Sequence, residues 1–124
     1  MSPSEYQILA ARTESTLPPY LVSDAIWRIQ HGAIGIATEA GELLDALKKH
    51  LYYQRGLDIV NVREELGDVL WYVALVCNAI GVDMGQVMEA NIDKLRQRYP
   101  EKFTPQLALN RDLDAERKAL EGET

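Results

Sequence analysis

The sequence predicts an all-α protein of four main helices, followed by a marginal charged helix over residues 110–121. Two observations favour this fold class. Apolar residues recur every three to four positions over long stretches, which is the spacing of one helix face. Gly, Pro and N-capping residues fall between those stretches, whereas strand signals are weak throughout. The chain shows no internal repeat and no linker, so we expect residues 1–124 to form a single domain.

The first two predicted helices lie on either side of a pair of prolines. The first covers about residues 5–15 and ends before the prolines. The second covers about residues 24–51, and Ser23 or Asp24 is a good N-cap, because a short polar side chain accepts hydrogen bonds from the first turn. This helix has one apolar stripe, which we expect to face the core. The stripe consists of Ile26, Ile29, Ala33, Ala37, Ala40, Leu44, Leu47 and Leu51.

The third and fourth helices are bounded by clear capping signals. The third is expected to start at Asn61, with Glu64 placed to complete a capping box, and to stop at Gly81. The fourth is expected to start at Asp83 and to end at Tyr99, directly before a proline. The short break between these two helices leaves room for a turn only.

The third helix is apolar on more than one side. Trp71, Leu75 and Ala79 fall outside its main apolar stripe. A helix that is apolar nearly all round is buried on several sides, and a chain this short has few elements to cover it. We therefore expect a helical bundle completed by oligomerisation, at least as a dimer. The main stripe consists of Val62, Leu66, Val69, Val73, Val76 and Ile80.

Composition excludes several classes of protein. The net charge of -6 argues against a broad nucleic-acid-binding surface. The single cysteine, Cys77, excludes an internal disulfide framework and suits a reducing compartment. The longest apolar stretch, residues 69–80, is shorter than the roughly 20 residues of a membrane span, and the start of the chain lacks the pattern of a signal peptide. We expect a cytoplasmic protein without a nucleic-acid or membrane partner.

Two pairs of carboxylates carry most of the functional information. They are Glu39 with Glu42 and Glu65 with Asp68, each pair spaced three apart, so that each lies on one side of a helix. The intervening 65 − 42 − 1 = 22 residues allow the two helices to run antiparallel, which would bring the pairs together. Such an acidic cluster is costly unless it is neutralised, and a hard divalent cation with a phosphate ligand is the best candidate.

The acidic residues allow other interpretations. Isolated pairs of glutamates are most often solvated helix faces. A di-iron carboxylate site requires Glu-x-x-His, but Arg28 and Leu47 precede His31 and His50 by three positions. A zinc site is a weaker alternative still, since the chain has one cysteine and two dispersed histidines.

Two glycines accompany the first acidic pair. Gly32 and Gly35 lie with Ala46 on the helix face that also carries Glu39 and Glu42. Glycine inside a helix costs about 1 kcal/mol relative to alanine, so something must approach this face closely. A ligand and a neighbouring helix remain equally open at this point.

The fourth helix presents polar residues on one side. Asn91, Lys94 and Arg98 are spaced three and four apart, beside the core line of that helix. The two cations would suit the phosphate chain of a substrate. A salt bridge to the acidic cluster is an equally open interpretation.

Taken together, these motifs resemble the MazG-like family of all-α nucleoside triphosphate pyrophosphohydrolases. The resemblance covers about residues 25–103, which leaves a charged tail of residues 104–124. The ordered set is far more specific than one acidic pair. Its parts are Glu39-Ala-Gly-Glu42-Leu, Glu65-Leu-Gly-Asp68-Val-Leu-Trp-Tyr, Asn91-x-x-Lys94-Leu and Arg98-Tyr99-Pro100-Glu101-Lys102-Phe103.

The resemblance implies hydrolysis of a nucleoside triphosphate between its α- and β-phosphates, giving a monophosphate and pyrophosphate. It implies Mg²⁺, with Mn²⁺ as a substitute, and assembly as a homodimer or homotetramer. The alternatives are a specialised substrate such as phosphoribosyl-ATP or dUTP, or a non-catalytic helical module that binds a nucleotide or a partner. Implied metal ligands and catalytic residues are Glu39, Glu42, Glu65 and Asp68, with orientation of the attacking water as the alternative role for one of them. Implied substrate contacts are Asn91 and Lys94, to which the spacing on the fourth helix adds Arg98.

Overall fold

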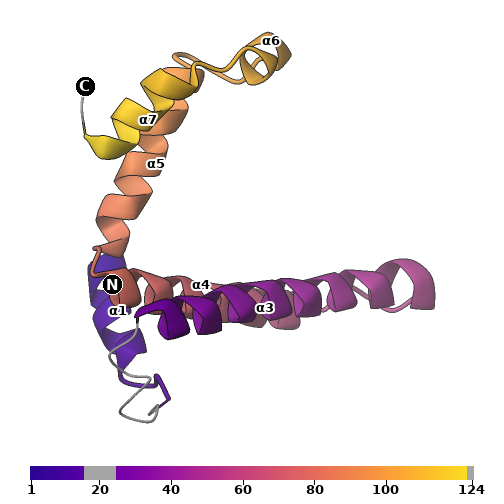
Figure 1. The fold of residues 1–124 in the computed structure, drawn as a ribbon. Coiled ribbons are helices and arrows are strands. Elements are labelled where there is room, and N and C mark those ends of the chain that lie inside the picture. The colour runs from indigo at the N-terminus through magenta and orange to yellow at the C-terminus, as the bar shows by residue number, and fades with distance from the viewer. Residues whose placement is uncertain (16–24, 123–124) are drawn as a thin grey trace. The chain divides into compact units, whose positions relative to one another are not determined.

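The computed structural model describes residues 1–15 and 25–122, and the described residues form helices and no strands. This confirms the predicted all-α class. The chain divides into two compact units, Met1–Asp83 and Met84–Thr124. The helices are α1 (Pro3–Ala11), α3 (Ala25–Tyr53), α4 (Ile59–Ile80), α5 (Met84–Arg98), α6 (Pro105–Leu109) and α7 (Leu113–Glu121) (Figure 1).

The start of α4 differs from the sequence prediction. We expected Asn61 as the first residue, but the N-cap is Asp58, whose side chain accepts hydrogen bonds from the backbone N–H groups of Val60 and Asn61. An aspartate satisfies two free donors of the first turn, so the helix begins earlier. The predicted end is confirmed, because Gly81 adopts φ 70°, a left-handed conformation that glycine takes without strain.

The ends of the other helices follow local signals. The predicted caps of α3, Ser23 and Asp24, lie outside the described residues. The marginal helix of the tail is confirmed as α7, with Asp112 as its N-cap. The short helix α6 was missed, although Thr104 caps it and a proline follows directly.

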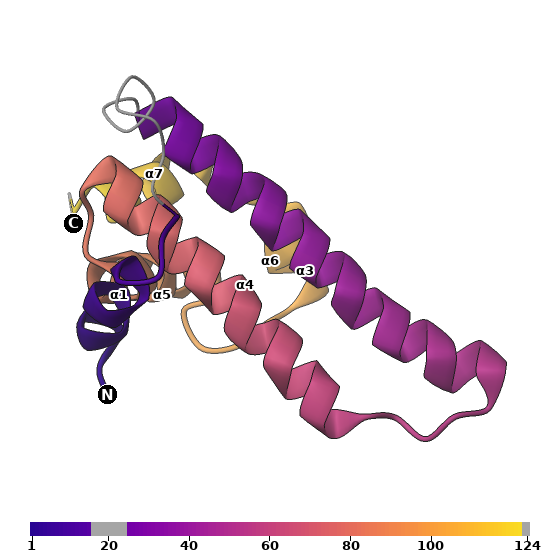
Figure 2. The same cartoon turned by 90° about the horizontal axis from the view of Figure 1, so that it is seen from below.

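In the first unit, α3 and α4 lie side by side and run in opposite directions (Figures 1 and 2). The two glycines of α3 face α4. A Cβ atom at Gly32 would lie 2.3 Å from Cγ2 of Val76, and one at Gly35 would lie 2.1 Å from Cδ1 of Tyr72. The close approach that these glycines permit is therefore that of another helix, which decides between the two alternatives left open by the sequence.

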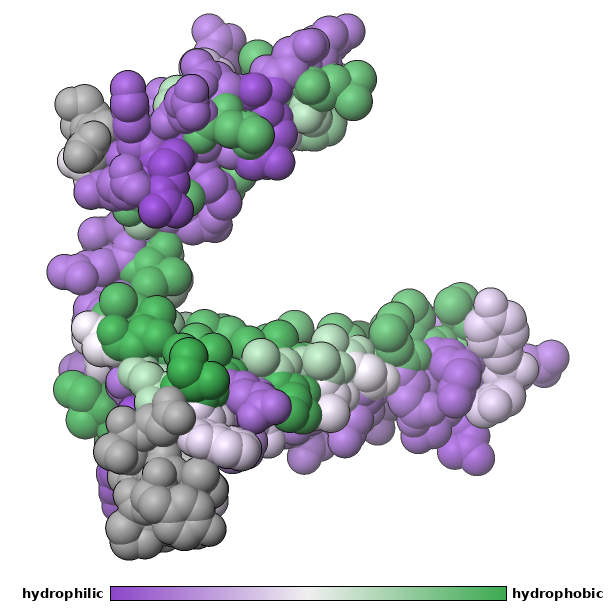
Figure 3. Space-filling model, in the orientation of Figure 1, coloured by the Kyte–Doolittle hydropathy of each residue, from purple (hydrophilic) through white to green (hydrophobic). Residues whose placement is uncertain are grey.

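The apolar stripe of α3 does not face α4 and stays largely exposed within the first unit. Leu44, Leu47 and Leu51 are 66%, 43% and 60% exposed. The glycine face allows the closer helix contact, and a pair of helices buries only one side of each. Figure 3 shows hydrophobic side chains along the α3–α4 pair.

Helix α1 packs on α4 through polar contacts as well as apolar ones. The buried side chain of Gln7 donates hydrogen bonds from Nε2 to Oδ1 of Asn78 over 2.9 Å and to the carbonyl oxygen of Val82 over 2.7 Å. Nε1 of Trp71 donates to Oγ1 of Thr13 over 2.7 Å. These contacts fix the N-terminal helix against the end of α4.

In the second unit, α7 packs on α5. Glu116 of α7 is 4% exposed and accepts two hydrogen bonds from Arg98, at 2.8 and 2.6 Å. Arg111 also donates twice to the same carboxylate, at 3.2 and 2.6 Å. Two arginines around one buried carboxylate form a charge-assisted network that holds the tail.

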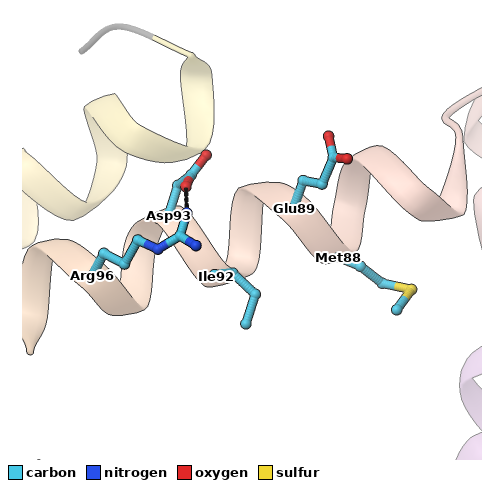
Figure 4. A pocket seen from close by; sticks show the side chains of 5 residues that line it. All are labelled: Met88, Glu89, Ile92, Asp93 and Arg96. Carbon is cyan, nitrogen blue, oxygen red and sulfur yellow. Dashed lines mark hydrogen bonds and ion pairs between the residues drawn. The ribbon is translucent and has the colours of Figure 1, made fainter. Parts of the chain in front are cut away.

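The surface of α5 carries a shallow hollow of about 510 Å³. Figure 4 shows Met88 and Ile92 on one side of the helix, and the ion pair between Asp93 and Arg96. All residues that line this hollow belong to α5 and none belongs to the acidic pairs.

Among the described residues, no single helix is both long and apolar enough to cross a membrane; α4 and α5 meet that measure only when counted together across their break.

Candidate metal centre

Three carboxylates from two helices meet in the first unit. Glu39 and Glu42 come from α3 and Glu65 comes from α4, and one oxygen from each lies within 4.8 Å of the others. Glu65 is buried, Glu39 is half-buried and Glu42 is exposed. The antiparallel packing of α3 and α4 thus brings the first acidic pair together with Glu65 of the second pair, with one side open to solvent.

The electrostatics of this cluster disfavour an extra negative charge. The pKa of Glu39 is raised, first because the carboxyl is partly desolvated and then because the carboxylates of Glu42, Asp68 and Glu65 repel its charged form. No ion pair to these carboxylates occurs in the described ranges 1–15 and 25–122. A bound cation would relieve this repulsion.

Asp68 lies at the margin of the cluster. It is exposed and does not belong to the group of three, although it is near enough to raise the pKa of Glu39. Beside it, the hydroxyl of Tyr6 donates a hydrogen bond to the carbonyl oxygen of Gly67 over 3.3 Å. The pKa of Tyr6 is raised by burial and by the charge of Asp68. No local sequence pattern predicts this contact, because Tyr6 and Gly67 are 61 positions apart.

Asn61 also belongs to the surroundings of the centre. Its Nδ2 donates to Oε1 of Glu65 over 2.7 Å. The sequence assigned Asn61 to capping only. The spacing of four between an amide and a carboxylate on one helix is the signal that would have found this pair.

The donor set fits a hard divalent cation. All three donors are carboxylate oxygens, and the group contains neither His nor Cys. The two histidines are engaged elsewhere: the ring of His31 contacts Tyr72 edge-on, and Nδ1 of His50 lies 2.8 Å from the carbonyl oxygen of Arg55. Oxygen donors favour magnesium or manganese over zinc.

The three predicted substrate contacts lie in the second unit, on α5. Asn91 is exposed and Lys94 is half-buried. The structure pairs Arg98 with Glu116 rather than with an acidic residue of the first unit. Contact of these three side chains with substrate stays a prediction.

Comparison with known proteins identifies the family. Residues 31–103 match the model of the MazG nucleotide pyrophosphohydrolase domain. The chain belongs to this MazG family. The matched range contains α4, α5 and both acidic pairs, whereas α1 and α7 lie outside it.

One relative is similar over most of the chain, and its name states neither a family nor an activity. The Gene 37 protein of Mycobacterium phage L5 is 35% identical to this MazG protein over 97 residues, covering 75% of the present chain and 84% of the phage protein. No solved structure matches the chain. The acidic cluster therefore lies within a nucleotide pyrophosphohydrolase domain, and its residues are suited to hold a metal ion.

Proposed function

We propose that this chain is a Mg²⁺-dependent nucleoside triphosphate pyrophosphohydrolase. It would cleave ribo- or deoxyribonucleoside triphosphates between the α- and β-phosphates, releasing a monophosphate and pyrophosphate. The observation that carries this proposal is the convergence of Glu39, Glu42 and Glu65 within 4.8 Å, inside the range that matches the MazG domain.

The three glutamates would hold the metal ion. When bound, the ion supplies positive charge for the triphosphate and acidifies a coordinated water. Glu65, which is buried, provides a fixed donor from α4, while the exposed Glu42 borders the open side of the centre. Without the ion, the carboxylates repel a substrate that carries about four negative charges.

Two roles are open to Asp68. It either extends the set of ligands or orients the attacking water as a hydrogen-bond acceptor. Its exposure and its place outside the group of three support the second role. Direct Mn²⁺ titration of Asp68→Asn decides between them: a ligand's loss weakens metal binding, whereas a water-orienting residue's loss lowers turnover and leaves metal affinity unchanged.

Asn91, Lys94 and Arg98 are proposed to contact the phosphate chain or the sugar. Lys94 is the better candidate of the two cations, because Arg98 is already engaged by Glu116. Lys94→Gln is expected to raise KM for the nucleotide and to change the melting temperature little. An unchanged KM would contradict the proposed contact between Lys94 and the substrate.

We also propose that the active form is a homodimer or homotetramer. Large apolar side chains on both long helices are exposed, among them Leu44 and Leu51 of α3 and Leu66 of α4. Contiguous exposed apolar surface of this kind is typical of subunit interfaces. Sedimentation equilibrium measures the assembly, and a monomer at micromolar concentration would contradict it.

The deciding experiment is a panel of ribo- and deoxyribonucleoside triphosphates, assayed with and without Mg²⁺, in which pyrophosphate and the nucleotide product are measured together. Release of monophosphate and pyrophosphate only with metal supports the proposal. Activity confined to dUTP or phosphoribosyl-ATP would favour a specialised enzyme. Metal-independent nucleotide binding without turnover would favour a non-catalytic module.

A further inference from the structure

Asn61 lies one turn before Glu65 on α4 and contacts its carboxylate directly. The amide Nδ2 of Asn61 donates to Oε1 of Glu65 over 2.7 Å. Glu65 is 4% exposed, so water reaches its oxygens poorly. A buried carboxylate needs hydrogen-bond donors, and here the amide takes the place of water.

The Asn61 side chain is not needed to cap α4. The carboxylate of Asp58 accepts hydrogen bonds from the backbone N–H groups of Val60 and Asn61, each over 3.1 Å. These two bonds satisfy two of the free donors at the helix start without the Asn61 side chain. The amide of Asn61 is therefore directed along the helix toward Glu65, and its role lies with that carboxylate.

A neutral amide is suited to hold a carboxylate that must bind a cation. It fixes the rotation of the carboxyl group but leaves the negative charge in place for the metal. An arginine in that position would neutralise the carboxylate, as Arg98 and Arg111 do for Glu116. Asn61 donates to Oε1 of Glu65, so the amide does not occupy the other carboxylate oxygen.

We infer that Asn61 is a positioning residue of the metal centre. Its amide fixes the Glu65 carboxylate in the orientation in which it joins the two glutamates of α3. This inference rests on the proposed function, because it assigns Asn61 a role in the same centre. It goes beyond that function because Asn61 does not belong to either acidic pair.

The same side chain borders a pocket, so the test must separate two effects. Asn61 lines a cavity of about 460 Å³ at the connection between α3 and α4, together with Lys49 and Arg55. A substituted Asn61 would alter this pocket as well as the hydrogen bond to Glu65. Metal binding measured without nucleotide reports on the carboxylate alone.

Calorimetric titration of the full chain with Mn²⁺ tests the inference. Asn61→Leu keeps the branched shape of the side chain and removes the donor, and we expect Kd for Mn²⁺ to rise by about ten-fold or more, since such outer partners of metal ligands contribute about 10- to 100-fold. Asn61→Ala is a second variant, chosen because alanine favours the helix. Asn61→Gln retains an amide and is expected to bind Mn²⁺ more tightly than Asn61→Leu.

Asn110 provides a matched control. Its Nδ2 donates to the carbonyl oxygen of Gln106, four residues earlier, over 2.9 Å, and Asn110→Leu is expected to leave the Mn²⁺ affinity unchanged. An unchanged Kd in folded Asn61→Leu and Asn61→Ala would overturn the positioning role and leave the metal centre standing. Absence of Mn²⁺ binding by the unaltered chain would overturn the metal centre itself, and this inference with it.

Discussion

Two equally buried glutamates stand in opposite electrostatic surroundings. Glu65 in the first unit and Glu116 in the second are each 4% exposed. Glu116 accepts four hydrogen bonds from Arg98 and Arg111. Glu65 accepts one from the neutral Asn61 and lies beside two further carboxylates. Burial alone therefore does not reveal what a charged residue does.

The difference distinguishes a carboxylate with a structural role from one that we propose to bind a metal ion. Removing a carboxylate from water is costly, and Glu116 is stabilised at once by its two arginines, which hold its pKa far below the usual range. Among residues 1–15 and 25–122 the acidic cluster has no arginine or lysine ion pair, and the pKa of Glu39 is raised instead. Like charges left without a partner in a folded protein are typical of a site that awaits a ligand.

The largest expected effect is on turnover, from a change in the proposed metal centre. Glu42→Gln removes a proposed metal ligand, and we expect turnover to fall by about 100-fold or more, because even outer partners of ligands contribute up to about 100-fold. Pyrophosphate release measures the loss, and circular dichroism checks that the helices remain. Glu64→Gln, on α4 but outside the group of three, is the control. Near-normal turnover in Glu42→Gln would reject the centre.

The second test concerns the packing that brings the carboxylates together. A Cβ atom at Gly35 would overlap the ring of Tyr72, so Gly35→Ala is expected to lower stability by about 1–3 kcal/mol and to lower turnover by separating α3 from α4. Urea denaturation measures the change in stability.

Gly41 is the matched glycine on the same helix. A Cβ atom there meets nothing within 4 Å, and Gly41→Ala is expected to raise stability by about 1 kcal/mol. Equal effects of the two substitutions on stability would contradict the close α3–α4 contact.

The third test disrupts the hydrogen bonds between Arg98 and Glu116. Arg98→Met leaves Glu116 with one arginine and is expected to lower the melting temperature of the chain. Arg96→Met removes an exposed pair with Asp93 and is expected to have a much smaller effect, because exposed pairs contribute little. If Arg98→Met instead raised KM without loss of stability, Arg98 would belong to the substrate site.

The smallest expected effect is the pH dependence of the metal-free chain. The raised pKa of Glu39 means that its ionised form destabilises the fold, so this penalty is absent below the unfolded value of about 4.3 and complete above the folded pKa. The lowered pKa of Glu116 means that its stabilisation is complete above about 4.3 and is lost as the pH falls through the folded pKa, in strong acid.

Mild acidification should therefore first relieve the acidic cluster, and stronger acid should then release α7. Melting temperatures in the presence of a chelator, from about pH 7 to about pH 3, measure the first effect and the onset of the second. Glu39→Gln should abolish the first effect and leave the second. A first effect that persists in this variant would assign it to another group.

Local features of the sequence predicted much of this protein. The helices were predicted from the apolar spacing. Gly81 ends α4 as predicted, and the charged tail forms the predicted helix α7. The start of α4 was misplaced because Asp58 competes with Asn61 for the same cap. Predictions of helix ends, whether correct or wrong, depend on atoms within one helical turn.

The sequence by itself determined the all-α class, the spacing of the acidic pairs and the family, since each depends on residues that are close together along the chain. Only the tertiary structure decided that the glycine face of α3 meets α4, that Asp68 lies outside the group of three, and that Arg98 binds Glu116. These outcomes depend on which of several compatible surfaces pack together. That choice is governed by steric fit and by the burial of charge between distant segments, neither of which leaves a local pattern.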